Sequence, residues 1–209
     1  MILPVAPLVL LSFIPAGLAL NLTPGADMMF CLGQGLRAGP LAAMAANLGI
    51  AAGGMVQVLM AGLGLGALVA AHPWSFETIR WAGILYLLVL AVQSLRGGMV
   101  RPGEVAVARP LVVFRQAFTV NILNPKVILF ILAFLPQFVD PSRPVLSQFL
   151  TLGLVFSLGG LVVNGVVGGM AGGIGRRLAQ SAGLARWLGR ISAGIFAGLA
   201  IRLALMQRG

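Results

Sequence analysis

Two charged residues inside apolar stretches are the groups in this chain best suited to do chemistry. Asp27 and Lys126 each lie in a membrane-length apolar run, and each comes shortly after a proline, Pro24 or Pro125. A charge at the centre of a bilayer costs roughly 2.5–3.5 kcal/mol on insertion scales, so it is rarely kept without a partner or a task. The two residues therefore indicate a charged site within a membrane, with one charge from each half of the chain.

The prolines predict that both apolar helices are broken. A proline within a helix removes one backbone hydrogen bond and clashes with the carbonyl four residues earlier. In a membrane the freed carbonyl must face protein or water, and transporters commonly build their midplane sites at such breaks. We expect the substrate or ion site to consist of Asp27, Lys126, Thr23, Pro24, Gly25, Asn121, Asn124 and Pro125.

Polar side chains near the breaks and within the spans allow two interpretations. Those flanking the breaks are Asn21, Thr23, Asn121 and Asn124. They can satisfy freed backbone groups or contact a zwitterionic ligand, and we expect backbone repair for at least half, because Asn and Thr cap helices well. Further polar residues within the spans are Asn47, Gln57 and Asn164. For these, hydrogen bonds between helices are favoured over ligand contacts.

Composition identifies an integral membrane protein. The 209 residues are 59% hydrophobic and 9% charged, with a mean hydropathy of +1.03. A soluble domain would carry charge on about a quarter of its residues. The net charge of +10 comes from basic residues that cluster between apolar runs. The positive-inside rule explains this clustering, and no soluble basic module is present to bind nucleic acid.

Six apolar runs are long enough to span a bilayer, which takes about 20 residues. They cover residues 5–35, 41–70, 78–96, 112–136, 148–173 and 187–206. The loops on one side carry Arg37, Arg96, Arg101, Arg109, Arg115, Arg176, Arg177, Arg186 and Arg190. The opposite side has Arg80, Arg143, Arg202 and Arg208. The richer side is predicted to be cytoplasmic, which places both termini in the periplasm.

The spans divide into two groups of three, so that one transporter domain fills residues 1–209. Residues 1–100 form the first half and residues 111–209 the second, joined by a cytoplasmic linker at residues 101–110. Halves with an odd number of spans must insert with opposite orientation, as in an inverted-topology repeat. The predicted fold is therefore an all-α membrane protein of six transmembrane helices in two three-helix inverted repeats, broken at Pro24 and Pro125.

Topology places the two charges at one depth. Asp27 lies ten residues before Arg37, and Lys126 lies eleven residues after Arg115. At 1.5 Å per residue, each charge is roughly 15 Å from the cytoplasmic edge, close to the midplane. We expect an Asp27–Lys126 ion pair between the halves. It could act as a gate or a proton site, or only as a permanent salt bridge that locks the halves together.

Several classes of function find no support in the residues. Cys31 has no partner for a disulfide, and no Cys, His or clustered carboxylates form a metal site. No phosphate-binding loop and no nucleophile with its base are present, so we expect neither an enzyme nor a cofactor. Small residues recur four apart, as in Gly194 and Gly198. This spacing favours tight packing within the bundle and also allows a homo-oligomer.

The motifs resemble those of the lysine exporter (LysE/RhtB) family of bacterial amino-acid efflux proteins. The first matching stretches are Thr23-Pro24-Gly25-Ala26-Asp27, Arg37-Ala38-Gly39 and residues 81–87. The strongest runs from Phe118 to Phe138 and includes Asn121, Asn124-Pro125-Lys126 and Phe134. Members of the family typically carry a proline where this chain has Ala26, a change that removes one rigid residue before the aspartate.

The resemblance implies a multi-pass exporter of amino acids or close derivatives in the bacterial inner membrane. Protons or another ion would drive export, as in an antiporter, with Asp27 taking the proton or the substrate ammonium. Lys126 would pair with Asp27 or with the substrate carboxylate. A second hypothesis remains open, in which the chain is a non-transporting membrane scaffold and the two charges form only a lock.

Overall fold

The computed structural model describes residues 4–71, 75–96, 109–170 and 181–205, and these residues form helices without a β-strand. The elements are α1 (Pro7–Leu22), α2 (Ala26–Ala38), α3 (Pro40–Ala71), α4 (Ser75–Arg96), α5 (Pro110–Ile122), α6 (Pro125–Ala133), the short 3₁₀ helix η1 (Leu135–Phe138), α7 (Val145–Gly169) and α9 (Ala182–Leu205). Most of the predicted linker, residues 101–108, lies outside the described residues.

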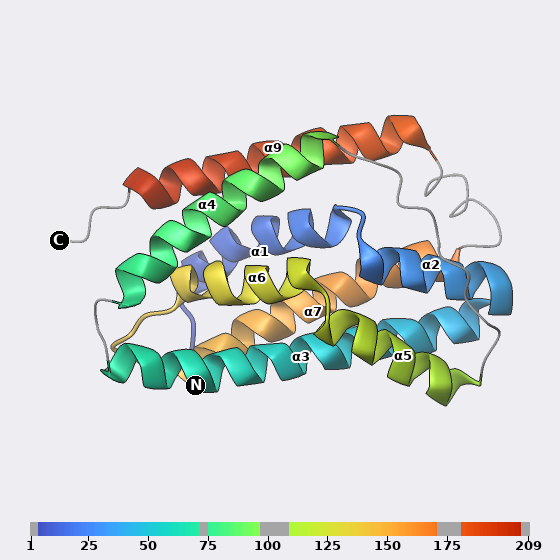
Figure 1. The fold of residues 1–209 in the computed structure, drawn as a ribbon, viewed down its shortest axis with the longest axis horizontal. Coiled ribbons are helices and arrows are strands. Elements are labelled where there is room, and N and C mark those ends of the chain that lie inside the picture. Colours follow the sequence, from blue (N-terminus) through green and yellow to red (C-terminus); the bar gives the residue numbers. More distant parts are fainter. Residues whose placement is uncertain (1–3, 72–74, 97–108, 171–180, 206–209) are drawn as a thin grey trace.

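The helices run back and forth along the long axis of the molecule (Figure 1). Helix α3 packs along α5 and α7, while α4 packs along α9. Two helices next to the breaks connect these groups, because α1 contacts α7 and α9 and α6 contacts α3 and α4. Helix α2 packs on α3, α5 and α7. Consecutive helices or bent helix pairs occupy the described parts of the six apolar runs predicted from the sequence.

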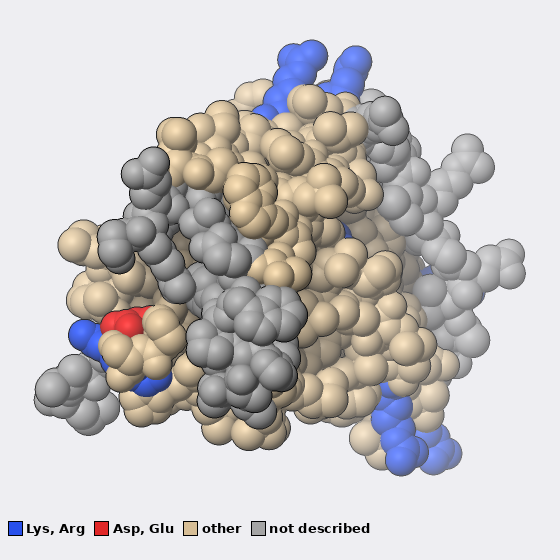
Figure 2. Space-filling model, turned by 60° about the vertical axis from the view of Figure 1, so that its left-hand side comes forward, with Lys and Arg blue, Asp and Glu red and all other residues tan. Residues whose placement is uncertain are grey.

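Length and composition qualify some of these helices as membrane spans. Among the described residues, Pro40–Gly64 of α3 and Val145–Gly169 of α7 are long and apolar enough to cross a bilayer. The pairs α1–α2 and α5–α6 qualify as well if each is one bent span. Helix α4 contributes a shorter apolar stretch, Trp81–Leu95. The surface seen in Figure 2 is mostly uncharged, with basic side chains projecting at its edges, as expected of a protein in contact with lipid.

Both predicted helix breaks are present. The chain bends by 54° between α1 and α2 and by 53° between α5 and α6. At the first break, Thr23 Oγ1 donates a hydrogen bond to the Ala19 carbonyl at 2.7 Å. At the second, the Asn124 side chain caps α6 by accepting a hydrogen bond from the Lys126 backbone N–H at 3.1 Å. Asn124 thus carries out the backbone repair expected of its residue type, whereas the Ala19 carbonyl that Thr23 Oγ1 contacts already accepts the Thr23 backbone N–H at 3.0 Å.

Hydroxyl groups on the two outer helices, α4 and α9, donate hydrogen bonds to backbone carbonyls near the breaks. The Tyr86 hydroxyl on α4 donates to the Lys126 carbonyl at 2.7 Å, and the Ser192 hydroxyl on α9 donates to the Ala19 carbonyl at 3.2 Å. Helix α4 precedes the linker and α6 follows it, whereas α9 comes from the second half and α1 from the first. The last helix of each half therefore supports the broken helix of the other.

A cluster of phenylalanines packs beside the breaks, where α1, α6, η1 and α7 meet. The rings of Phe130 and Phe134 have centroids 4.8 Å apart, those of Phe130 and Phe156 5.0 Å, and those of Phe13 and Phe138 5.2 Å. Phe13, Phe130 and Phe134 are buried. These spacings suit edge and offset ring packing, which stabilises a core beyond its buried area.

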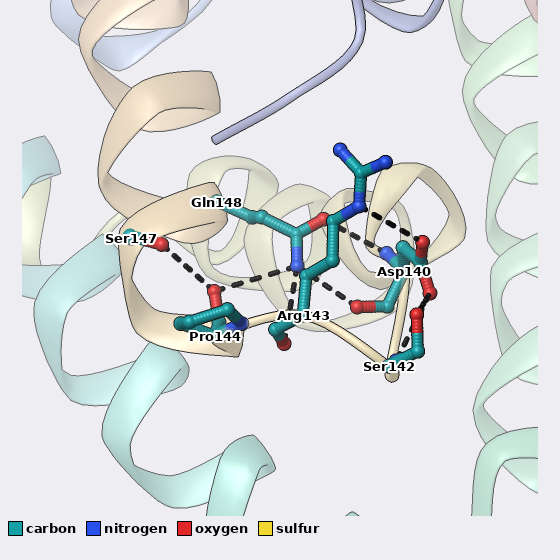
Figure 3. Close-up of polar contacts among 6 residues, drawn as sticks. All are labelled: Asp140, Ser142, Arg143, Pro144, Ser147 and Gln148. Atoms are coloured by element: carbon teal, nitrogen blue, oxygen red, sulfur yellow. Dashed lines mark hydrogen bonds and ion pairs between the residues drawn. The ribbon is translucent and has the colours of Figure 1, made fainter. Parts of the chain in front are cut away.

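The turn between η1 and α7 is ordered by one buried amide (Figure 3). Gln148 Oε1 accepts from the Asp140 backbone N–H at 2.9 Å, and its Nε2 donates to the Asp140 carbonyl at 2.8 Å. Asp140 Oδ1 accepts from the side chain and backbone of Ser142, and Arg143 lies 3.4 Å from Oδ2. The two hydrogen bonds from Ser142 hold the pKa of the Asp140 carboxyl below its usual range. The aspartate thus acts as a turn residue, as its proline and serine neighbours suggest.

Helices α3 and α5 approach so closely at Gly49 that no larger residue fits. A Cβ atom built there would lie 2.3 Å from the Phe114 carbonyl oxygen. We predict that Gly49→Ala lowers the free energy of unfolding by about 1–3 kcal/mol, because the backbone must shift to relieve the overlap. The matched control is Gly64→Ala on the same helix, where a Cβ would meet nothing within 4 Å. Thermal unfolding in detergent checks both variants, and equal melting temperatures would contradict the close approach.

The hydroxyl supports predict a second stability effect. Tyr86→Phe and Ser192→Ala each remove one hydrogen bond to a break while keeping most of the side-chain volume, so each should lower the free energy of unfolding by about 0.5–1.5 kcal/mol. Ser12→Ala is the control, because the Ser12 hydroxyl only bonds the Leu8 carbonyl within α1. If Tyr86→Phe and Ser192→Ala unfold at the same temperature as Ser12→Ala, the outer helices do not support the breaks.

Candidate functional site

The two breaks meet at a cavity of about 40 Å³ that is lined by both polar and apolar residues. It is lined by Leu20, Asn21, Thr23, Gly25, Asp27, Met28, Asn47, Ile50, Ala51, Gly54, Asn121, Asn124, Lys126, Val127, Phe156, Ser157, Gly160, Leu161 and Asn164. The lining thus comes from both broken spans and from α3 and α7, which pack on each other. A volume of this size accommodates a few waters, whereas pockets for small ligands measure about 300–1,000 Å³. The structure therefore shows the site in a contracted form.

Asp27 lies in the first turn of α2, directly after the first break. A carboxylate in this position is favoured by the positive end of the helix dipole. Its Oδ2 accepts a hydrogen bond from Asn121 Nδ2 at 2.9 Å, whereas no group lies within hydrogen-bond distance of the buried Oδ1, although the Asn124 side chain also interacts with the carboxylate. One carboxylate oxygen therefore remains available to a proton or to a cationic group that enters the cavity.

Lys126 lies in the first turn of α6, where the dipole of its own helix disfavours a cation. Its Nζ instead donates to the Thr23 carbonyl just beyond the end of α1, at 2.6 Å. Partial negative charge at a helix C-terminus stabilises an ammonium group. A Cβ atom at Gly25 would lie 3.3 Å from Nζ, so a glycine at this position leaves room for the lysine to cross the interface.

The structure does not contain the direct ion pair expected from the sequence. Among the described residues, no ion pair within 4.0 Å joins Asp27 to Lys126. The carboxylate bonds to an amide from the opposite break, and the ammonium bonds to a freed carbonyl. The physical reason is that the helix ends at the breaks supply partners of opposite polarity, so each charge is compensated without touching the other.

The other predicted site residues fall into two groups. Thr23, Gly25, Asn121 and Asn124 line the cavity together with the two charges, whereas Pro24 and Pro125 form the breaks without lining it. Asn21 also lines the cavity, and its Nδ2 donates to the Phe156 carbonyl at 3.1 Å. The structure thus brings six of the eight predicted residues around one space. Their part in binding stays a prediction.

Residues of α3 and α7 complete the site, and the sequence indicated them only weakly. Asn47 Nδ2 donates to the Leu161 carbonyl at 2.8 Å, the expected bond between helices, while its Oδ1 has no partner; Asn47 and Asn164 both line the cavity. Gln57 Nε2 donates to the Asn121 carbonyl at 2.7 Å and so positions the amide that holds Asp27. Ser157 lines the cavity from α7, and no neighbouring motif marked it beforehand.

Apolar clusters flank the cavity on two sides. The phenylalanine cluster lies toward the end of the bundle where α1 begins and α6 ends (Figure 1). Toward the opposite end, a small apolar plug is formed by Cys31, Ala46, Ile50, Val113 and Ala117. Phe156 belongs to the first closure and Ile50 to the plug, and both line the cavity. The cavity therefore lies between the bulky phenylalanine cluster and the smaller plug.

The site offers little to a metal ion. Within the part of the chain that the structure describes, no three His, Cys, Asp or Glu side chains come together. The groups that surround the cavity are instead one acid, one lysine, several amides and freed backbone groups. They suit a small ligand that carries both charges, such as an amino acid.

Comparison with known proteins gives several relatives. The chain is 33% identical over 146 residues to a homoserine/homoserine lactone efflux protein of Salmonella typhimurium. This alignment covers 69% of this chain and 71% of that protein. It is 27% identical over 210 residues to a leucine efflux protein of Salmonella choleraesuis, with 94% of each chain covered. An uncharacterized membrane protein of Vibrio cholerae is 33% identical over 149 residues, or 69% of this chain and 71% of that protein. No solved structure matches.

A family model matches more of the chain than the homoserine efflux protein and the Vibrio cholerae protein do. The model of the LysE type translocators matches residues 18–207, which include both breaks and the whole cavity lining. The named relatives are efflux proteins, and translocation rather than enzymatic chemistry is the activity of the family. The chain belongs to the LysE type translocator family.

Proposed function

We propose that this translocator exports a neutral amino acid or a close derivative across the bacterial inner membrane by alternating access. Its six spans form two inverted repeats, with both termini in the periplasm and the arginine-rich end in the cytoplasm. The proton gradient drives export, because a proton and the substrate ammonium compete for the Asp27 carboxylate. Lys126 binds the substrate carboxylate once its ammonium group has left the Thr23 carbonyl.

One observation carries this proposal. Two broken helices place an acid with an unpaired oxygen and a lysine bound to a backbone carbonyl on the walls of one cavity. A permanent lock would gain most from direct contact between the charges, because leaving a buried charge without its partner is costly. The observed partners are an amide and a carbonyl, which a zwitterionic ligand can replace.

The two closures account for alternating access. Separation of α5 from α2 and α3 opens the plug and joins the cavity to the cytoplasm. Separation of α6 and α1 at the phenylalanines opens the opposite side. In the contracted form both closures are shut, so the cavity must widen at least several-fold before it holds an amino acid.

The cavity wall favours a neutral side chain. Asp27 is the only acid among the described residues that line it, and the ammonium of the substrate uses that acid. A cationic side chain would be left without an opposite charge, at a cost that is large inside a membrane. Leu20, Val127 and Phe156 offer apolar contact instead. The names of the relatives, homoserine and leucine efflux proteins, agree with this class.

A non-transporting scaffold remains the second hypothesis, and the named relatives do not support it. A scaffold would need the packing of the helices but not an unpaired buried carboxylate oxygen. An unpaired buried polar atom costs about 1–3 kcal/mol, which a purely structural protein has no reason to retain.

Asp27→Asn tests the proposal. The change keeps the size of the side chain but removes its charge, so export of L-leucine and L-homoserine should fall at least about tenfold, the equivalent of one lost charged hydrogen bond. The measurement is uptake of each radiolabelled amino acid into everted membrane vesicles energised with a proton gradient. L-Lysine serves as the cationic comparison and should be carried more slowly.

Asp140→Asn is the matched control, because it makes the same change in the exposed turn before α7. It should transport as the unaltered protein does. Full export by Asp27→Asn, at equal protein levels, would contradict the mechanism. If the unaltered protein transports none of the three amino acids into the vesicles, the proposed function itself is contradicted.

A further inference from the structure

Gln34 is a buried polar residue that the central cavity does not use. It lies on α2, seven residues after Asp27, and its side chain is 0% exposed. Neither its amide nitrogen nor its amide oxygen has a hydrogen-bond partner. Both ends of a buried amide are therefore unsatisfied, which costs about 1–3 kcal/mol for each group.

Helix geometry places Gln34 on the same face as Asp27. Residues four and seven positions apart share one side of an α-helix, so Asp27, Cys31 and Gln34 form a line along α2. At 1.5 Å per residue, Gln34 lies roughly 10 Å farther along the helix than Asp27. This direction leads away from the break and toward Arg37 at the end of α2.

The plug separates the two polar residues. Cys31, between them on this face, packs against Ala46 and Ile50 of α3 and against Val113 and Ala117 of α5. Other residues of α2, among them Leu32, pack with Val163 and Val167 of α7 instead. The line from Gln34 to Asp27 thus runs along the α3–α5 side of the helix and past the plug.

The chemistry of Gln34 matches an amino acid. Its amide offers donors to a carboxylate and an acceptor to an ammonium group, so it can satisfy either end of a zwitterion. Of the buried amide side chains that the structure describes, only Gln34 has both its nitrogen and its oxygen left without a partner. The same groups are of no use to apolar packing against neighbouring helices.

We propose that Gln34 is a second substrate contact on the cytoplasmic side of the plug, which holds a zwitterionic amino acid before it reaches Asp27. This inference rests on the proposed function. When α5 moves away from α2 and α3, the substrate passes from the Gln34 amide to the Asp27 carboxylate, and the plug closes behind it. Gln34 is buried and unpaired in the contracted form because that movement has not taken place.

Cysteine accessibility tests the position of Gln34. Cys31→Ala provides a thiol-free background, since Cys31 is the single cysteine of the chain. Gln34→Cys in that background should react with N-ethylmaleimide in everted vesicles, and saturating L-leucine or L-homoserine should slow the reaction at least about threefold. Leu32→Cys is the matched control, because Leu32 is also buried but faces α7. It should stay unlabelled.

Labelling of Gln34→Cys no faster than Leu32→Cys would overturn the proposal. Labelling that neither amino acid slows would overturn it too, because it would show an accessible residue without a bound substrate.

Transport kinetics test the amide itself. Gln34→Leu should raise the KM for the transported amino acid about tenfold, the equivalent of a lost hydrogen bond to a charged group, with little change in the maximal rate. Gln34→Asn keeps an amide and should recover most of the lost affinity. A purely structural role would instead leave KM unchanged and alter protein levels or thermal stability.

The unaltered protein in the same vesicles separates the two claims. If it transports but Gln34→Leu keeps the same KM, only the second contact is wrong. If it transports nothing, the proposed function fails first.

Discussion

The polar groups freed at the two helix breaks are the constraint on which the rest of the structure depends. In a membrane each unpaired backbone group costs several kcal/mol, so a broken span survives only if other residues satisfy it. Two hydrogen bonds join the breaks directly, one from the Lys126 ammonium to the Thr23 carbonyl at 2.6 Å and one from the Asn121 amide to the Asp27 carboxylate at 2.9 Å. The hydroxyls of Tyr86 and Ser192 reach the breaks from the outer helices. Neither half of the chain therefore satisfies its own break alone.

The same constraint produces a polar space enclosed by apolar contacts. Because both breaks must face protein, their charges, amides and carbonyls converge on one cavity, and the unbroken helices α3 and α7 close it. Phenylalanines seal one side, and the smaller plug around Cys31 seals the other. The two clusters differ in bulk, because several phenylalanine rings form one and smaller side chains around Cys31 form the other. Such a difference suits a protein that admits substrate at one side and releases it at the other.

The sequence predicted the parts of this arrangement that follow from local chemistry. Proline in an apolar run predicts a break, and both breaks are present at Pro24 and Pro125. Charges at equal distance from basic residues predict a common depth, and Asp27 and Lys126 line one cavity. The predicted ion pair was wrong because groups at the ends of the broken helices bind the two charges instead. The positions of these groups depend on how the halves pack. Gln34 gave no signal, since one amide in an apolar helix is distinctive only when its neighbours are known.

The central claim is that Asp27 and Lys126 each bind the substrate rather than each other, and equilibrium binding tests it most directly. Radiolabelled L-leucine and L-homoserine are titrated onto the purified protein and onto Asp27→Asn and Lys126→Met. Saturable binding to the unaltered protein, lost in both variants, is the predicted result. Undiminished binding to either folded variant would contradict the claim, because one of the two charges would then lie in the cavity without contacting the substrate.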